Sequence, residues 1–509
     1  MAKADCIVAL DEGTSNAKAV VVDAQGTIVA RASRPLTLQT PQPGWVEQRG
    51  ETLLAASLAV LREAIALAGA SRIAGIAISN QRETAIGWRR SDGQPIGPAL
   101  TWQCARSADF CERLRRDRQD EAVRRATGLP LSPLFSASKM RWLLDHCADG
   151  QRLAENGELC LGTIDAWLLW HLSGGRAFGC DASNAARTQL LNLVSGDWDE
   201  QMLALFNIPR QALPTIHPSC HLFGTTLGLE GIADGIPIGA MVGDSHAALY
   251  GHALGQAGQV KATYGTGSSV MAPIAEAQCG INALATTIAW HDGERMQYAL
   301  EGNIPHTGDA IAWMLDITAM PQGDDTPLSE LPARVPDSGG VYFVPALTGA
   351  GAPWWDEQAR GVICGLNRGT RREHLVRAAF EAVAYQIADV IGVLRQQPGF
   401  TLQGLMADGG PSRNDWLMQF QADLLGCPVW RSNTAELSAL GAALMAMRSL
   451  WGATDRQLTA LLPQHDEFKP DMQRHRQLQE SYRVWRQAVQ RTLWRPQAAS
   501  LKQENNHES

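Results

Sequence analysis

Short apolar runs separated by polar turns mark the first forty residues of the chain. The runs cover residues 6–10, 19–22 and 28–34, and the turns cover residues 11–16 and 23–27. Apolar runs of this length, bounded by Gly, Asp and Asn, indicate strands. Three consecutive strands joined by tight turns predict an antiparallel meander at the start of a mixed sheet.

Helical spacing follows this meander. Residues 52–68 carry apolar positions three and four apart, and residues 73–79 form an apolar run typical of a buried strand. Helix and strand patterns continue to alternate until about residue 250. This alternation favours an α/β layer fold.

The opening pattern returns in the second half of the chain. Residues 259–264 and 269–274 indicate two strands, and residues 265–268 form a Gly/Ser turn between them. A duplicated architecture would place two phosphate-facing loops across a cleft. We expect domains over 1–250 and 251–509, with the boundary in the glycine cluster at 251–258. The tail beyond Pro470 has a charged, helical pattern, and we expect its last ten or so residues to be disordered.

Composition narrows the classes of function. A length of 509 residues suggests two large domains, and 45% hydrophobic with 19% charged residues is an ordinary globular balance. The net charge of -8 gives no support to a nucleic-acid partner or an anionic membrane surface. No apolar run approaches the ~20 residues of a membrane span, and we expect no signal peptide.

The ten cysteines stand singly, without a Cys-x-x-Cys pair. This spacing indicates neither a zinc site nor a redox motif, and a disulfide framework is untypical of so long a chain. We therefore expect reduced thiols and a cytoplasmic protein.

Two familiar nucleotide motifs are missing. The chain has no Gly-x-x-x-x-Gly-Lys-Ser/Thr loop, and the Gly265-Thr-Gly267 start of a dinucleotide fingerprint runs into Ser268-Ser-Val270. A dehydrogenase of Rossmann type is therefore disfavoured.

Two aspartates stand at predicted strand ends. Asp11, in Asp11-x-Gly13-Thr14, can hold Mg²⁺ through waters beside backbone amides that approach phosphate, or it can belong to a plain hairpin turn. Asp244 opens an apolar helix after the run 236–242, so it fits either a general base or a helix N-cap.

Further polar groups follow other strands. Arg82 and Glu83 come after the strand at 73–79 and suit a ligand with several hydroxyls, although a solvated loop would look the same. Trp102 could offer its face to a carbon skeleton or fill the core. Residues 408–414 form a strand-to-helix turn with two glycines, which lets a phosphate or a flat ligand approach a helix N-terminus.

Together these segments resemble the FGGY family of carbohydrate kinases, and within it the glycerol kinase branch. The resemblance covers residues 5 to 490 and includes residues 8–14, 43–47, 80–84, 264–267, 349–354 and 417–426. It implies two ribonuclease-H-like domains of the actin and hexokinase type, flanking a cleft for ATP and substrate. It also implies ATP-dependent phosphorylation of a small polyol or sugar, and a homodimer. A non-kinase, nucleotide-switched binding module of the same superfamily is the alternative from another class.

The resemblance also implies roles for individual residues. Asp11 would lie near Mg²⁺, Asp244 would be the general base, and Arg82, Glu83 and Trp102 would hold the acceptor. The ATP site would comprise Thr14, Ser15, Asn16, Lys18, Thr266, Gly267, Gly308, Gly410 and Asn414. Lys18 stands where the family usually has Arg, which keeps the charge without the fork geometry.

The acceptor pocket departs from the glycerol kinase pattern. Leu134 replaces a tyrosine, Ser245 replaces a glutamine and is followed by His246, and Ser269 replaces a phenylalanine that packs opposite the tryptophan. These changes predict a roomier, more polar pocket for a four- or five-carbon polyol or ketose. If neighbouring side chains refill the space, glycerol remains the acceptor.

Overall fold

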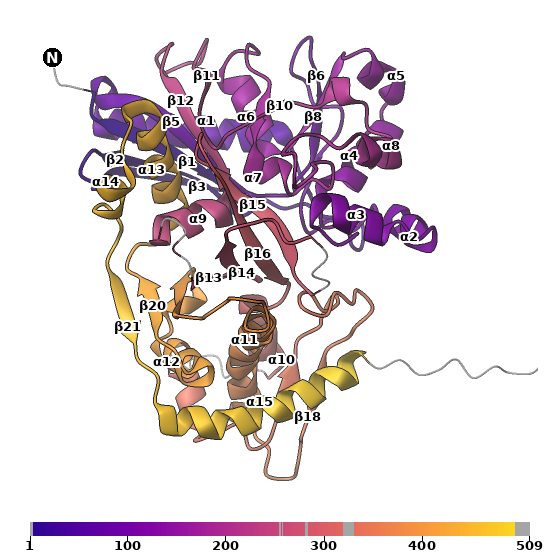
Figure 1. Ribbon diagram of the computed structural model, residues 1–509, viewed down its shortest axis with the longest axis vertical. Helices are drawn as coiled ribbons and strands as arrows, with labels where there is room; N and C mark the ends of the chain where they lie inside the picture. The colour runs from indigo at the N-terminus through magenta and orange to yellow at the C-terminus, as the bar shows by residue number, and fades with distance from the viewer. Residues whose placement is uncertain (1–3, 254–255, 257, 280–282, 319–329, 494–509) are drawn as a thin grey trace, which may run out of the picture.

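Two mixed β-sheets frame the molecule, one from each half of the chain (Figure 1). The computed structural model describes residues 4–253, 256, 258–279, 283–318 and 330–493. The first sheet has the strand order β11-β12-β5-β1-β2-β3. Its strands are β1 (Cys6–Glu12), β2 (Asn16–Asp23), β3 (Ile28–Pro35), β5 (Ile73–Asn80), β11 (Cys220–Thr225) and β12 (Pro237–Gly243).

The second sheet has the order β15-β16-β14-β13-β19-β20-β21. Its strands are β13 (Gln259–Tyr264), β14 (Ser268–Ile274), β15 (Ala285–His291), β16 (Met296–Ile304), β19 (Gly404–Asp408), β20 (Val429–Ser432) and β21 (His465–Phe468). The shorter strands lie outside these two sheets: β4 (Glu47–Gln48), β6 (Ile86–Arg89), β7 (Ala99–Leu100), β8 (Leu159–Gly162), β9 (Gly179–Asp181), β10 (Thr215–His217), β17 (Tyr342–Val344) and β18 (Val362–Cys364).

The two sheets repeat one pattern of pairing. β1 runs antiparallel to β2 and parallel to β5, and β5 runs parallel to β12. β13 runs antiparallel to β14 and parallel to β19, and β19 runs parallel to β20. The third strand, β3 or β16, pairs antiparallel with the second. The predicted meander and the duplication are both confirmed, and each half has the ribonuclease-H-like order.

Helices connect and cover the strands. α1 (Gly50–Ala68) confirms the helix expected at 52–68, and its buried face includes Leu53, Leu61 and Ile65. The other helices of the first half are α2 (Ala108–Arg116), α3 (Asp120–Thr127), α4 (Ser136–Asp145), α5 (Gly150–Glu155), α6 (Ile164–Leu172), α7 (Ala182–Ala185), α8 (Glu200–Phe206) and α9 (Asp244–Ala253). The second half has α10 (Gly308–Ile317), α11 (Arg372–Leu394), α12 (Asp415–Leu425), α13 (Leu437–Trp451), α14 (Asp455–Thr459) and α15 (Met472–Leu493).

α13 crosses back to the first sheet. It lies beside α9, β5 and β12 in the upper part of Figure 1, and its side chains share a core with Ile7, Val20 and Ala77. Gly441 permits this contact, because a Cβ there would lie 1.9 Å from the carbonyl oxygen of Ala247. Residues from both halves therefore build one core, and the domain boundary at 251–258 stays a prediction.

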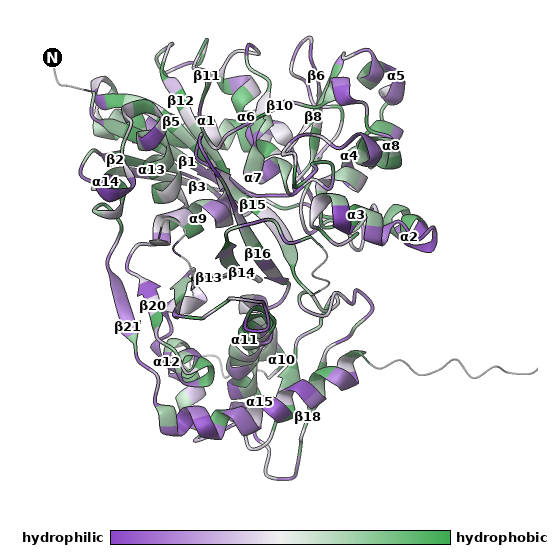
Figure 2. Ribbon diagram, viewed as in Figure 1, coloured by the Kyte–Doolittle hydropathy of each residue, from purple (hydrophilic) through white to green (hydrophobic). Residues whose placement is uncertain are grey.

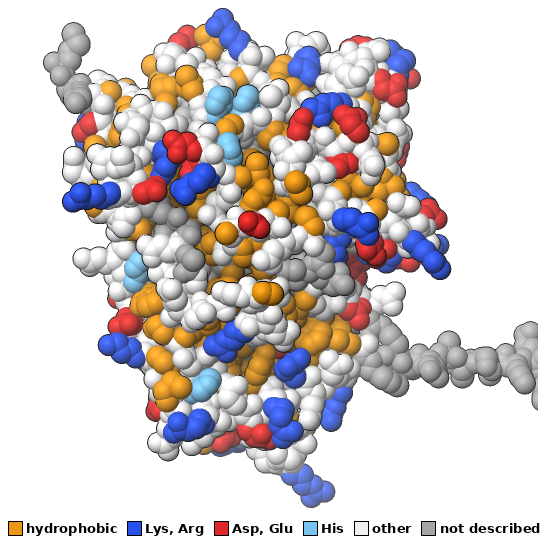
Figure 3. Space-filling model, in the orientation of Figure 1, with side chains coloured by type: hydrophobic (Ala, Val, Ile, Leu, Met, Phe, Trp, Pro, Cys, Tyr) orange, Lys and Arg blue, Asp and Glu red, His pale blue; other side chains and the backbone are white. Residues whose placement is uncertain are grey.

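Polar colouring gathers at the periphery, on α15 and β21 (Figure 2). Acidic and basic side chains are interspersed on the face drawn in Figure 3, without one large patch of either sign. Within the described residues, no helix is both long and apolar enough to cross a membrane.

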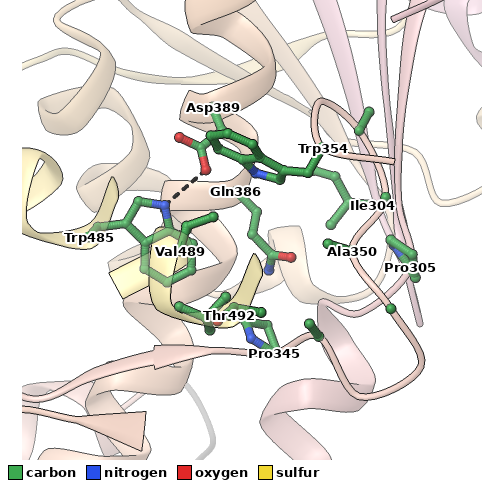
Figure 4. Close-up of a pocket in the computed structure, with 15 residues that line it drawn as sticks. Ile304, Pro305, Pro345, Ala350, Trp354, Gln386, Asp389, Trp485, Val489 and Thr492 are labelled. Atoms are coloured by element: carbon green, nitrogen blue, oxygen red, sulfur yellow. Dashed lines mark hydrogen bonds between the residues drawn. The ribbon is translucent and has the colours of Figure 1, made fainter. Parts of the chain in front are cut away.

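Asp389 of α11 anchors the helix α15. It accepts hydrogen bonds from the Tyr482 hydroxyl at 2.7 Å and from the Trp485 indole at 2.9 Å. Burial raises the pKa of Asp389 to about 6, against the effect of these donors. Figure 4 shows Trp485 of α15 and Trp354 of the loop at 349–355 beside this carboxylate, at a cavity of about 30 Å³. The cluster joins the last helix to that loop.

Replacing Asp389 by alanine should destabilise the protein by about 2–4 kcal/mol, because two buried donors lose a shared acceptor. Urea unfolding measures the loss, and limited proteolysis should cut α15 faster. The matched control is Glu480→Ala, an exposed change on the same helix, which should leave the urea midpoint close to that of the wild type. Equal effects of the two variants would contradict the anchoring role.

Candidate active site

The carboxyl ends of three neighbouring strands meet at one edge of the first sheet. Asp11 of β1 pairs in register with Ser79 of β5, which pairs with Val242 of β12. Asp244 follows β12 directly and begins α9. Parallel strands end at the same edge, so residues far apart in the sequence become neighbours there.

The two aspartates influence each other. Ser79 donates a hydrogen bond to Asp11 at 2.9 Å. Burial, and then the charge of Asp244, raise the pKa of Asp11 to about 6. Burial also raises the pKa of Asp244, although the nearby Arg82 guanidinium opposes this. A cation or a proton at this edge would relieve the repulsion between the two carboxylates.

Asp244 is more than a helix cap. Its Oδ1 accepts from the Ser245 amide at 2.6 Å and lies 3.4 Å from Arg82 Nε, while 35% of the side chain stays exposed. The Ser245 carbonyl in turn accepts from Lys261 Nζ of β13 at 3.1 Å. This arrangement leaves a carboxylate partly open to a ligand, while a lysine of the second half contacts the backbone beside it.

A chain of amides links the β1–β2 hairpin to the site. Gln81 Nε2 lies 3.2 Å from Glu12 Oε1 and 3.0 Å from Gln48 Oε1, and Gln48 donates to the Thr14 carbonyl at 2.9 Å. Trp102 Nε1 donates to the Thr14 hydroxyl at 3.0 Å. Thr14 and Trp102, expected on the phosphate and acceptor sides, are therefore in contact. Ser15 and Asn16 complete the hairpin, which the Gly13 amide closes on the Asn16 carbonyl at 3.0 Å.

The loops of the second sheet also converge. The Gly308 amide donates to the Gly265 carbonyl at 3.0 Å, and the Thr307 amide donates to the Thr266 carbonyl at 3.0 Å. The start of α10 therefore lies against the turn that contains Gly267.

The turn after β19 also lies beside the turn that contains Gly267. A Cβ at Gly409, where φ is +92°, would lie 2.0 Å from the Tyr264 carbonyl, so the backbones touch there. A Cβ at Gly410 would meet no atom within 4 Å. Thr266, Gly267, Gly308 and Gly410 thus border one edge of the second sheet, with open space above Gly410.

Two predicted nucleotide residues have other partners in this structure. Asn414 caps α12, since its side chain accepts from the Leu417 amide at 3.0 Å. Lys18 lies opposite Asp11 in register, but its ammonium pairs with Glu436 at 3.3 Å. Their roles toward ATP stay predictions.

A buried carboxylate joins the two halves next to the predicted acceptor residues. Arg82 donates to both oxygens of Glu301 of β16, at 3.0 and 2.8 Å. Arg187, which follows α7, lies 2.7 Å from the same carboxylate and donates to Glu83 at 2.6 Å. The two guanidinium groups lower the pKa of Glu301 despite its complete burial.

Glu83 occupies an unusual backbone conformation. Its φ is +60°, and the Thr84 amide donates to the Arg82 carbonyl at 2.7 Å around it. Ser136 and Lys139 donate to the Glu83 carbonyl at 3.1 and 3.3 Å. Non-glycine residues in this region cluster at functional sites, where the surroundings hold the strain.

The substituted pocket residues take three different places. Ser269 donates to Glu301 at 2.8 Å. Ser245 lies next to Asp244, as described above. Leu134 packs with Leu129 and Phe135 in a small cluster, and its carbonyl accepts from Lys139.

Several residues of this site were not predicted from the sequence. Glu301 is the one charged residue of its strand and Arg187 follows a run of small residues, which is the one signal that could have marked them. His246 is also buried, and neither ring nitrogen has a hydrogen-bond partner among the described residues. Burial and the neighbouring cations hold the pKa of His246 well below its usual value, so the ring is neutral.

Comparison with known proteins identifies the family. The profile of the FGGY family of carbohydrate kinases, N-terminal domain, matches residues 6–251, and that of its C-terminal domain matches residues 260–450. The chain belongs to this family. It is an ATP-dependent carbohydrate kinase.

Individual relatives extend over nearly the whole kinase. An apulose kinase of Pectobacterium atrosepticum is 46% identical over 495 residues, which cover 97% of this chain and 99% of the relative. A glycerol kinase of Alkalilimnicola ehrlichii is 44% identical, with 95% and 98% covered. The crystal structure of Plasmodium falciparum glycerol kinase with ADP superposes with a TM-score of 0.87 at 29% identity, covering 97% of this chain and 99% of that one.

Glu12 makes the stability of the kinase depend on pH. Its pKa rises from 4.5 to about 8, chiefly through burial. The folded state therefore binds one more proton than the unfolded chain between these values, and the stability that Glu12 contributes falls as pH rises through them. Glu12→Gln cannot ionise. We expect the difference in unfolding temperature between this variant and the wild type to shift by about 2 °C or more in favour of the variant from pH 5 to pH 8.

Thermal unfolding of the ligand-free kinase at both pH values measures this difference. The exposed Glu51→Gln on α1 is the matched control and should follow the wild-type curve. A constant offset between Glu12→Gln and the wild type would contradict the raised pKa.

Proposed function

We propose that this kinase transfers the γ-phosphoryl group of ATP to a hydroxyl of an acceptor longer than glycerol, a polyol or ketose of four or five carbons. The observation that carries the proposal is the environment of Ser269. This small hydroxyl residue contacts Glu301, the partner of Arg82, at the position where the glycerol kinase pattern has a phenylalanine. The likeness to an apulose kinase supports a longer acceptor.

The residues at the strand ends fit direct transfer. Asp244 would accept the proton of the attacking hydroxyl, because its side chain is partly exposed and lies 3.4 Å from Arg82 Nε. Arg82 donates two of its five N–H groups to Glu301 and lies in an ion pair with Asp244, so further N–H groups remain for the acceptor. Glu83 uses one carboxylate oxygen for Arg187, and the other remains to accept from a second hydroxyl.

A divalent cation fits the edge near Asp11. Mg²⁺ is usually held by one or two carboxylates, with waters and phosphate oxygens as further ligands. Within the described residues, no group of three or more His, Cys, Asp or Glu forms a full protein cage, and this agrees with such sparse ligation. When bound, Mg²⁺ would neutralise charge on the phosphoryl oxygens. Asp11 would hold it, because burial and then the charge of Asp244 raise the pKa of that carboxyl, and a bound cation would offset the repulsion between the two carboxylates.

The nucleotide would lie along the second sheet. Its binding residues would be Thr14, Ser15, Asn16, Lys18, Thr266, Gly267, Gly308, Gly410 and Asn414. The open space above Gly410 and the amides around Gly265 support this position. A cytoplasmic location stays a prediction from the cysteine pattern, and a homodimer stays a prediction from the family resemblance.

A coupled ADP-release assay with Mg-ATP tests the acceptor. We expect higher kcat/KM for at least one of erythritol, threitol, the pentitols, erythrulose and the ketopentoses than for glycerol or dihydroxyacetone. Relatives named glycerol kinase at 44% identity make glycerol the second candidate. Greater activity on glycerol than on every longer acceptor would refute the proposal.

The proposed base has its own test. Asp244→Asn should lower kcat by about 10²–10⁴-fold while the protein stays folded, because the amide cannot take the proton. Asp92→Asn, in an exposed turn, is the matched control and should keep wild-type turnover. Turnover of Asp244→Asn within tenfold of the wild type would contradict the role.

A further inference from the structure

Ser269 and Asn303 form one polar wall of the site. They are cross-strand partners in the β14–β16 pair, and Glu301 lies two residues from Asn303 on the same face of β16. Ser269 donates to Glu301 Oε1 at 2.8 Å, and Asn303 Nδ2 donates to the same oxygen at 3.1 Å. Neither the motifs nor the family pattern drew attention to Asn303.

Glu301 itself has no capacity left for a ligand. Its Oε1 takes Ser269, Asn303 and Arg82, and its Oε2 lies 3.0 Å from Arg82 Nη1 and 2.7 Å from Arg187 Nη1. A carboxylate offers about four lone-pair sites, so the four hydrogen bonds from Arg82, Ser269 and Asn303 occupy it, and Arg187 Nη1 adds an ion pair without hydrogen-bond geometry. The carboxylate is also completely buried.

The saturated carboxylate fixes the orientation of its neighbours. Asn303 Nδ2 faces Glu301, while its Oδ1 accepts from Arg187 Nη2 at 3.2 Å. The flipped orientation of the Asn303 amide is excluded, because it would place Nδ2 beside the Arg187 guanidinium and Oδ1 beside the Glu301 carboxylate. Ser269 directs its proton to Glu301, which leaves its oxygen lone pairs as acceptors.

Unused hydrogen-bonding capacity therefore remains on this wall. Asn303 retains one N–H and one carbonyl lone pair and is partly accessible, whereas Ser269 retains acceptor capacity but is only 8% exposed. The wall adjoins the acceptor residues, since Arg187 bridges Asn303 and Glu83.

We propose that Asn303 and Ser269 recognise a hydroxyl or carbonyl group on the acceptor beyond its third carbon, and so select a longer polyol or ketose over glycerol. This inference rests on the proposed function and deepens it. Arg82, Glu83 and Asp244 supply enough groups for a three-carbon unit, whereas the wall has a donor and acceptors for one further polar group. A site built to bind such a group disfavours a ligand that lacks it, because its own polar atoms then stay unpaired.

The test compares acceptors in single variants of the full-length kinase. We expect Asn303→Ala and Ser269→Ala to lower kcat/KM for erythrulose and xylulose by about 10–100-fold, and that for glycerol by less than about 3-fold. The KM for ATP should not change. Asn156→Ala, an exposed amide on the same chain, is the matched control and should leave the acceptor ratio unchanged.

Each outcome separates the two proposals. A wild-type preference for glycerol refutes the proposed function before any variant is made. A wild-type preference for longer acceptors, with equal losses on all acceptors in both variants, overturns this inference alone, because the residues would then only support Glu301. If Asn303→Ala does not fold, Asn303→Ser keeps a small polar group, and the same selective loss of longer acceptors is expected.

Discussion

One buried carboxylate, Glu301, is the interaction on which the active site depends. Removing a charge from water is costly, and a buried carboxylate persists only when cations and hydrogen-bond donors surround it. Arg82 and Arg187 come from the first half of the chain, whereas Glu301 belongs to the second sheet. The halves must therefore come together before the Glu301 carboxylate can be buried beside its two cationic partners. Because Arg82 also approaches Asp244, and Arg187 also binds Glu83, the same contact sets the positions of the acceptor residues.

The duplicated sheets explain where the chemistry lies. Each half brings the carboxyl ends of its central parallel strands to the cleft side, one half with carboxylates and the other with glycine turns. Asp11, Glu12 and Asp244 all have raised pKa values, which reflects negative charge concentrated in a buried place. A kinase that binds a nucleotide with a divalent cation would relieve this repulsion when its substrates arrive. The side chains of α13 pack in one core with residues of both sheets.

The local sequence pattern predicted the bounds of individual strands and helices and the residues at strand ends. The strand at 259–264 and the helix that ends at residue 68 have these bounds in the structure, and Asp11 and Asp244 each lie at the end of a strand as predicted. Pairings across long sequence separations could not be predicted: 219 residues separate Arg82 from Glu301, and 104 separate Glu83 from Arg187. The buried, neutral His246 follows from the packing around it, which no local motif encodes. Ser269 was predicted to enlarge the pocket, but its hydrogen bond to Glu301 required the strand register.

We propose that the polar wall of Ser269 and Asn303 beside Glu301 makes this kinase prefer an acceptor longer than glycerol. A competition in one tube measures it most directly, because product ratios from mixed acceptors equal the ratio of their kcat/KM values. Mg-ATP would be limiting over equal concentrations of glycerol, erythritol, erythrulose and xylulose, with the phosphorylated products separated by mass. The account predicts that phosphate appears mainly on a four- or five-carbon acceptor. Phosphate mainly on glycerol would contradict it.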